Sequence, residues 1–189
     1  GRLMFYADLK QAESMVVAYL AGDEAYIDAH RSGDTHTFVT RLLWPELPWT
    51  GDMKADKKIA KGLPDWDPVE GHDFRFQAKR IQHGSNYGLT PQGISMIAHI
   101  PRREAEIAQG RFFEAFPFIR PWQRETRRMV EEQETFVNPF GMEIDLFGRP
   151  WDEHTYKQGL AAIPQSTVAY VLNLGMLRVW IECRDEVEL

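Results

Sequence analysis

This sequence of 189 residues lacks several features that would mark a protein class. Its single cysteine, Cys183, excludes an internal disulfide framework and fits a reducing compartment. No uninterrupted apolar run approaches the roughly 20 residues of a membrane span. The net charge of −6 gives no bulk attraction to nucleic acid. We therefore expect a globular protein that needs no membrane and whose nucleic-acid contacts, if it makes any, come from local basic patches.

The histidines also lack a metal-binding pattern. No pair among the six has the His-x3-His spacing with which one helix presents two ligands to zinc. A metal-dependent hydrolase stays open as an alternative, but this spacing does not favour it.

The hydrophobic periodicity predicts a mainly helical α+β fold with a small antiparallel sheet. We expect strands at residues 2–8, 135–138 and 142–147, the last two forming a hairpin. Helices are expected at 9–21, 24–31, 34–43, 74–86, 91–99, 102–116, 121–134 and 153–184, the last with a break near Ile163-Pro164. Asp34, Asp73 and Thr90 are expected to cap three of these helices. Residues 44–72 are rich in proline and tryptophan, which predicts a long surface excursion with a short helix at 54–61.

Four chemically distinctive residues recur at every fourth position of the helix expected at 74–86: Arg75, Lys79, His83 and Tyr87. Each step of four turns the stripe by only about 40° and advances it by about 6 Å. Two cations therefore stand at one end of a helical face, with an imidazole and a phenol at the other. This arrangement suits a nucleoside triphosphate with its phosphates near Arg75 and Lys79. The alternative is an amphipathic surface helix with two exposed cations.

Several segments in a fixed order resemble the family A DNA polymerases, which include bacterial polymerase I-like and phage replicative enzymes. They are Ala7–Glu13 with Ala18–Glu24, Asp34-Thr35-His36-Thr37, residues 75–88, Phe136–Asn138 through Phe147–Arg149, and Pro164–Thr167. The resemblance covers almost the whole chain. It implies palm structure at 1–43, an insertion at 44–72, fingers at 73–134 and palm again at 135–189, with the fingers resting on part of the palm.

The resemblance also implies a reaction and its partners. A template-directed DNA polymerase joins a deoxynucleotide (dNTP) to a primer 3′-hydroxyl on primer–template DNA, in the cytoplasm of a bacterium or of a phage-infected host. Asp8 would bind both Mg²⁺ ions, since hard cations prefer carboxylate and phosphate oxygens. The structural alternative for Asp8 is a helix N-cap. Gln11 would help to select the nucleotide, and Glu13 would occupy the space of a ribose 2′-hydroxyl. The alternative for Glu13 is a solvated helix carboxylate.

The remaining site residues follow from the same resemblance. His36, Arg75 and Lys79 would contact the phosphates, and Lys79 could also protonate the departing pyrophosphate. Tyr87 would bind the dNTP by stacking near the template and the nascent pair. Gly88 would contact the DNA, ending the fingers helix and giving the template room to bend. Gln165 would reach the minor groove of the primer–template. The alternative is a polar residue in the first turn of the last helix.

The sequence also departs from the family pattern. His83 stands where the family usually has Phe or Tyr, and we expect it to alter selection at the nucleotide sugar. The strand–turn–strand with His-Asp that supplies the second metal-binding carboxylate is expected after the last helix, and the sequence ends at Leu189 before it. Residues 1–189 alone are therefore expected to be inactive in DNA synthesis.

Two further alternatives to a DNA polymerase stay open. Single-subunit RNA polymerases share the aspartate and the fingers helix, but the Gln11-x-Glu13 context argues against them. A non-catalytic nucleic-acid-binding protein would bind DNA without any response to a triphosphate.

Overall fold

The computed structural model describes residues 8–66, 71–132 and 135–183, and most of them are helical. The helices are α1 (Ala12–Ala21), α2 (Glu24–Arg31), α3 (Thr35–Leu43), α4 (Met53–Ala60), α5 (Phe74–Asn86), α6 (Pro91–Ala98), α7 (Arg102–Ala115), α8 (Ile119–Glu131) and α9 (Glu153–Cys183). Strands β1 (Phe136–Val137) and β2 (Glu143–Ile144) pair antiparallel. The expected α+β fold is confirmed. Residues 2–7 of the strand expected at 2–8 lie outside the described residues.

Short polar side chains set the start of several helices. The Asp34 carboxylate accepts a hydrogen bond from the Thr37 amide at 3.3 Å, and Asp73 accepts one from Phe76 at 2.6 Å. Thr90 caps α6 in the same way. These bonds satisfy backbone N–H groups that have no partner within the helix, so the three expected caps are confirmed.

The start of α1 differs from the expectation. The helix begins at Ala12 instead of residue 9, after Gln11 in a left-handed conformation (φ 57°). Asp8 therefore lies ahead of the cap position, and its interpretation as an N-cap is wrong. The carboxylate is exposed and free to take another role.

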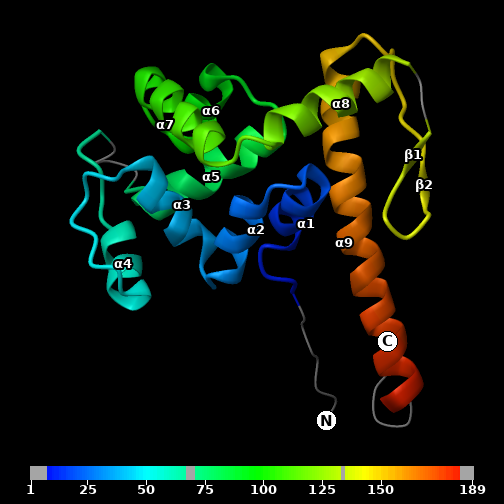
Figure 1. Cartoon of the computed structure of the whole chain (residues 1–189), viewed down its shortest axis with the longest axis horizontal. Helices are drawn as coiled ribbons and strands as arrows, with labels where there is room; N and C mark the ends of the chain where they lie inside the picture. The colour runs from blue at the N-terminus through cyan, green and yellow to red at the C-terminus, as the bar shows by residue number, and fades with distance from the viewer. Residues whose placement is uncertain (1–7, 67–70, 133–134, 184–189) are drawn as a thin grey trace.

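The body of the molecule consists of α2, α3, α5, α6 and α7, packed side by side with α5 in contact with three of the others (Figure 1). Its core contains the rings of Tyr26, Phe112 and Phe116, whose centroids lie 4.4–5.8 Å apart. Ala78 and Ile81 lie on the inner side of α5 and are buried in this core. The polar stripe of α5 is consequently held by a helix whose other side is buried.

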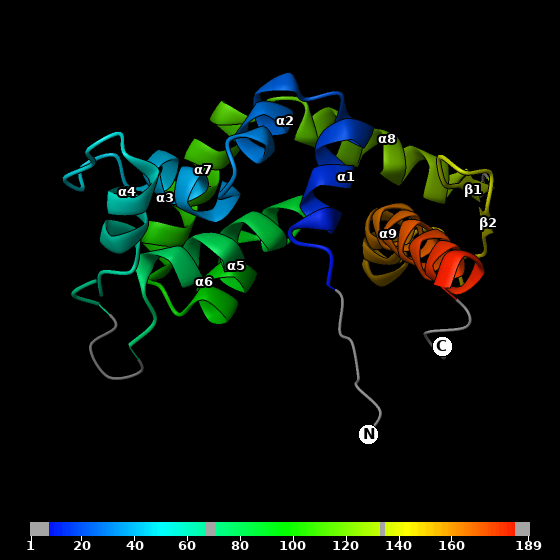
Figure 2. The same cartoon turned by 90° about the horizontal axis from the view of Figure 1, so that it is seen from below.

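The limb consists of α8, the β1–β2 hairpin and α9. Figure 2 shows it beside the body, with α1 between the two. A small core of Val130, Phe136 and Ile163 joins its parts. The expected hairpin is present with the register Phe136 to Ile144, although each strand has only two residues. Gly159 allows α9 to approach α8 closely, because a Cβ there would lie 2.8 Å from Val130 Cγ2.

The break expected in the last helix is absent, and α8 begins two residues earlier than expected. Helix α9 runs through Pro164 without the expected break (Figure 1). Pro164 removes one backbone hydrogen bond, but its burial with Leu160 and Ile163 offsets that loss. Helix α8 begins at Ile119, so Pro121 falls within its first turn, where the missing N–H would have no helical partner.

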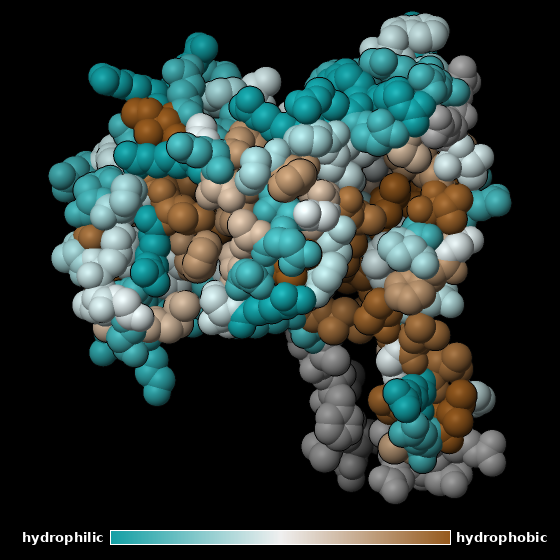
Figure 3. All heavy atoms as spheres, in the orientation of Figure 1, coloured by the Kyte–Doolittle hydropathy of each residue, from teal (hydrophilic) through white to brown (hydrophobic). Residues whose placement is uncertain are grey.

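The second half of α9 is apolar and exposed. Leu174, Leu177, Trp180 and Ile181 are each 45–62% exposed, and Figure 3 shows brown hydrophobic surface over this part of the limb. By length and composition α9 could cross a membrane, with a mean hydropathy of 1.3. That is weak evidence for a membrane, because core helices of soluble proteins pass the same test.

The excursion at 44–72 is anchored to the body where the structure describes it. It contains α4, close to the expected helix at 54–61. The buried Asp56 carboxylate accepts hydrogen bonds from the backbone N–H and the hydroxyl of Thr50, at 2.8 and 2.9 Å. Trp44 and Trp66 pack against Phe74 at the start of α5. The excursion therefore packs against the start of α5, the helix that carries the polar stripe.

Candidate active site

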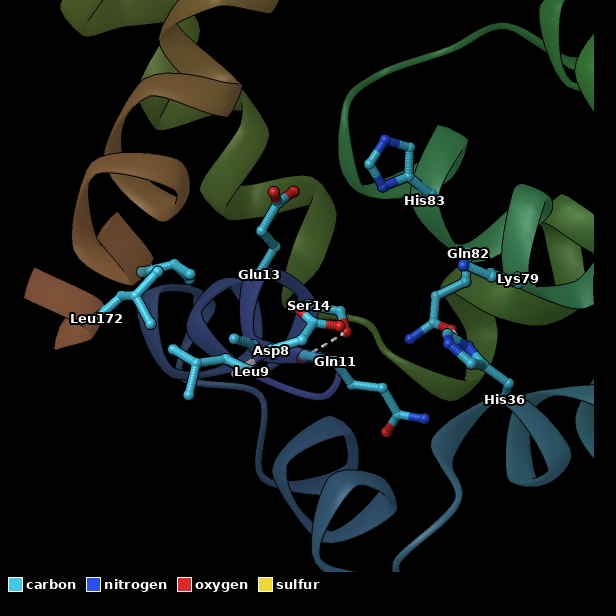
Figure 4. Close-up of a pocket in the computed structure, with 12 residues that line it drawn as sticks. Asp8, Leu9, Gln11, Glu13, Ser14, His36, Lys79, Gln82, His83 and Leu172 are labelled. Carbon is cyan, nitrogen blue, oxygen red and sulfur yellow. Dashed lines mark hydrogen bonds between the residues drawn. The ribbon is translucent and has the colours of Figure 1, made fainter. Parts of the chain in front are cut away.

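A cavity of about 350 Å³ opens between α1, α3, α5 and α9. Six of the residues singled out from the sequence line it: Asp8, Gln11, Glu13, His36, Lys79 and His83. Figure 4 shows them converging from three separate parts of the chain, with Leu172 of α9 on the opposite wall. The cavity thus combines carboxylates, a permanent cation and two imidazoles.

Only some residues of the α5 stripe line the cavity. Lys79 and His83 are exposed and line the cavity. Arg75 does not line it; instead its Nη2 donates to both oxygens of Asp34, at 2.9 and 3.2 Å. Lys57 of α4 also lies 3.2 Å from this carboxylate. Burial alone would raise the pKa of Asp34, but the two cations and the Thr37 amide outweigh burial and lower the pKa to about 2.

Glu13 and Tyr87 form a pair at the other end of the stripe. The Tyr87 hydroxyl donates to Glu13 Oε2 at 2.9 Å. Burial, followed by the Glu13 charge, raises the pKa of Tyr87, so the phenol keeps its proton. The His83 ring meets the Tyr87 ring edge-on, with centroids 4.7 Å apart. Glu13 is therefore a fixed wall of the cavity, and the alternative of a freely solvated carboxylate does not describe it.

Both histidines of the cavity favour the neutral state. Burial lowers the pKa of His36, and the Arg75 and Lys79 cations add to that effect. Its Nδ1 lies 2.9 Å from Gln82 Oε1. Desolvation by the surrounding protein also lowers the pKa of His83, while Glu13 opposes it.

The end of α5 faces a second, basic cavity of about 300 Å³. Gly88 lines it, together with Arg120, Arg124 and Arg127 of α8. Gly88 has φ 70°, and a Cβ there would lie 3.2 Å from Leu160 Cδ1. The Arg127 guanidinium lies 3.8 Å from the centre of the Tyr156 ring. Gln165 lines neither cavity and is exposed on α9.

Analysis of the sequence missed Gln82, which lines the first cavity although its side chain is almost completely buried. Its position carries a signal: Gln82 lies three residues after Lys79, so the two share a helical face. A search for polar residues three positions from Lys79 on this amphipathic helix would have identified Gln82.

Asp8 supplies oxygen ligands of the kind that Mg²⁺ prefers, and it stands at the cavity in an exposed position. Over residues 8–66, 71–132 and 135–183, no group of three or more His, Cys, Asp or Glu side chains could hold a metal ion. The donor chemistry of Asp8 thus fits magnesium, with the remaining ligands to come from phosphate oxygens, water or other groups.

Comparison with known proteins places the chain in a family. The sequence model of DNA polymerase family A matches residues 1–187. The chain therefore belongs to the family A DNA polymerases. It is 27% identical over 179 residues to DNA polymerase I of Mycobacterium tuberculosis, covering 92% of this chain and 18% of that protein. It is 29% identical over 190 residues to DNA polymerase I of Pseudomonas aeruginosa, covering 96% and 19%.

A thermostable relative and a solved structure agree with this assignment. The chain is 31% identical over 150 residues to DNA polymerase I of Thermus filiformis, covering 79% of this chain and 15% of that protein. It shares its fold with the polymerase domain of Pol1 from M. smegmatis, solved with DNA primer–template and dNTP. That match has a TM-score of 0.70 at 22% identity, over 94% of this chain and 29% of that one. The chain spans 15–19% of the length of these curated relatives.

Proposed function

We propose that this protein acts as a template-directed DNA polymerase and that its first cavity binds the incoming dNTP. One observation carries the proposal: Asp8, Glu13, His36 and Lys79 come from three separate segments and line the same cavity. Membership in the DNA polymerase family supports the same chemistry.

The ends of the cavity differ in a way that fits a nucleotide. Lys79 and His36 line the same cavity and lie close enough for the Lys79 charge to lower the pKa of His36 (Figure 4). Lys79 can donate hydrogen bonds to phosphate oxygens, and His36 can do so once its Nε2 is protonated. The His83 ring and Tyr87 lie further along α5, and together with Glu13 of α1 they form a surface for the sugar. We assign the triphosphate to the first end and the deoxyribose to the second.

Arg75 can contribute without leaving its partner. Its Nη2 is held by Asp34, while its Nε is buried with no hydrogen-bond partner. A guanidinium has five N–H donors, so a phosphate can bind to one that Asp34 does not use.

The proposed chemistry assigns a role to each remaining group. Magnesium held at Asp8 would supply charge neutralisation for attack by the primer 3′-hydroxyl. Lys79 donates a hydrogen bond to the triphosphate and a proton to the pyrophosphate as it leaves. Glu13, fixed by Tyr87 at 2.9 Å, fills the space that a 2′-hydroxyl needs. His83 is proposed to tune selection at the sugar.

DNA contacts are proposed at the second cavity and along α9. The arginines near Gly88 are suited to phosphates of a template strand that bends there. Gln165 is exposed and available to the minor groove of a primer–template. In this assignment residues 73–134 are fingers, 1–43 and 135–189 are palm, 44–72 is an insertion, and the protein acts in the cytoplasm.

Sugar selection tests the proposal against its alternatives. We expect the protein to bind dATP with Mg²⁺ more tightly than ATP, and Glu13→Ala to reduce that ratio at least several-fold. Equal binding of dATP and ATP by the unaltered protein would favour an RNA polymerase. Undetectable binding of both nucleotides, with DNA still bound, would favour a non-catalytic nucleic-acid-binding protein.

Primer extension tests the completeness of the site. Transfer with two metal ions uses ligands beyond one carboxylate. We therefore expect residues 1–189 alone to bind dNTP without efficient extension of a primer. Robust extension by this chain would contradict that part of the proposal.

A further inference from the structure

A buried polar network lies directly behind the first cavity. The side chains of Tyr26, Gln82 and Asn86 are at most 1% exposed. The Tyr26 hydroxyl accepts hydrogen bonds from Gln82 Nε2 at 2.7 Å and from Asn86 Nδ2 at 3.0 Å. Burial raises the pKa of Tyr26, so this hydroxyl stays protonated. Polar groups this deeply buried must be satisfied by one another, which makes their orientations interdependent.

The network fixes which end of Gln82 faces the cavity. Because Gln82 Nε2 donates to Tyr26, its Oε1 is left to face His36 Nδ1 at 2.9 Å. An amide oxygen can only accept a hydrogen bond, so a bond at this distance requires the proton on Nδ1. Figure 4 shows the Gln82 amide and the His36 ring meeting at the edge of the cavity.

We propose that Gln82 is a positioning residue that holds the proton of neutral His36 on Nδ1, so that Nε2 takes up a proton from solvent when His36 binds a triphosphate. The uptake rests on the proposed function; the position of the proton on Nδ1 does not. A neutral imidazole with its proton on Nδ1 has a bare Nε2, which cannot donate to phosphate. Protonation of Nε2 makes the ring a cation with a donor for the phosphate.

The charges around His36 decide when this protonation occurs. Arg75 and Lys79 of α5 disfavour the cation, and Asp34 at the start of α3 favours it. On α2, His30 is another neutral neighbour, since burial first and His36 second lower its pKa to about 4. Glu13 of α1 lines the same cavity. The negative charge of a triphosphate reverses this balance and stabilises the cation.

Nitrogen-15 NMR of the His36 ring tests the assignment directly. At a pH where the ring is neutral, we expect the proton on Nδ1, and we expect Gln82→Met to shift it towards Nε2. The matched control is Gln77→Met, because Gln77 is also fully buried on α5 and its side-chain amide makes no hydrogen bond to His36. A proton on Nε2 in the unaltered protein, or no change in Gln82→Met, overturns the proposal. If Gln82→Met fails to fold, the spectrum of the unaltered protein still shows whether the proton of neutral His36 is on Nδ1 or on Nε2.

Calorimetry tests the consequence for binding. We expect dTTP with Mg²⁺, titrated in buffers of different ionisation enthalpy, to show uptake of about one proton more than the His36→Gln variant. An equal number of protons in the two proteins overturns the uptake. Failure of dTTP to bind at all contradicts the proposed function and the uptake together, while the NMR result still decides the role of Gln82.

Discussion

The body and the limb of this molecule are built differently. The body surrounds α5 with helices on several sides and buries large aromatic rings such as Tyr26 and Phe112. The limb has a small core at Val130, Phe136 and Ile163, and the second half of α9 leaves its apolar side chains exposed. Folding energy from buried apolar surface is thus concentrated in the body.

This difference shows which part of the molecule positions the functional side chains. Lys79, His83 and His36 project from body helices, whose inner sides are buried. The limb adds only the apolar Val168 and Leu172 to the lining of the first cavity. The geometry of these three side chains therefore depends on the stability of the body, and changes in the exposed part of the limb should leave it intact.

A pair of core and surface substitutions tests this contrast most strongly. Phe112 is fully buried in the body, so we expect Phe112→Ala to lower the free energy of unfolding by about 3–5 kcal/mol. Leu177, 48% exposed on α9, should tolerate alanine within about 0.5 kcal/mol. Urea denaturation of the two variants measures both values. Similar losses would mean that the body and the limb contribute alike.

The Asp34 carboxylate should make the body sensitive to acid. Its folded pKa of about 2 lies below the ordinary 3.8. Its contribution is therefore present in full above about pH 4 and is lost as the pH falls through 2. We expect Asp34→Asn, which keeps a capping side chain, to cost about 2 kcal/mol at pH 7.

Denaturation as a function of pH separates this effect from a general loss of charge. The cost of Asp34→Asn should shrink as the pH falls towards 2. Asp28→Asn serves as the control, because Asp28 and its partner Arg31 are both mostly exposed. A cost for Asp34→Asn that stays constant with pH would contradict the ion-pair explanation.

Two glycine substitutions should have opposite signs. Gly88 lies where the body meets the limb with φ 70°, and its Cβ would press on Leu160, so Gly88→Ala should cost about 1–2 kcal/mol. Gly110 sits in the exposed middle of α7 with open space around it, and Gly110→Ala should stabilise by up to about 1 kcal/mol. Thermal unfolding of both variants checks the signs. Equal shifts of the unfolding temperature in the two variants would contradict the claim that the backbone conformation of Gly88 and its contact with Leu160 disfavour a Cβ.

Local features of the fold were predictable from the sequence because their causes are local. The spacing of Lys79 and His83 predicts that they share one helical face. Each of three helices begins after a residue whose side chain can cap it, namely Asp34, Asp73 and Thr90. The break expected at Pro164 was wrong, because burial in the tertiary structure outweighs the missing hydrogen bond.

Site features that depend on tertiary contacts were not predictable. Arg75 and Asp34 lie 41 residues apart in sequence, and their ion pair arises only when α5 packs on α3. The orientation of Gln82 likewise depends on Tyr26, which is 56 residues away. Sequence spacing could therefore identify the stripe, but not which of its cations would already have a partner.

The dissociation constant for dTTP with Mg²⁺ tests the central claim most directly. Loss of a hydrogen bond to a charged group costs about 1.5–3 kcal/mol, so Lys79→Met should weaken binding about 10- to 100-fold. Lys58→Met, which removes the same charge from the exposed face of α4, should leave binding unchanged. Equal affinities for Lys79→Met and the unaltered protein would contradict the claim that this cavity holds the triphosphate.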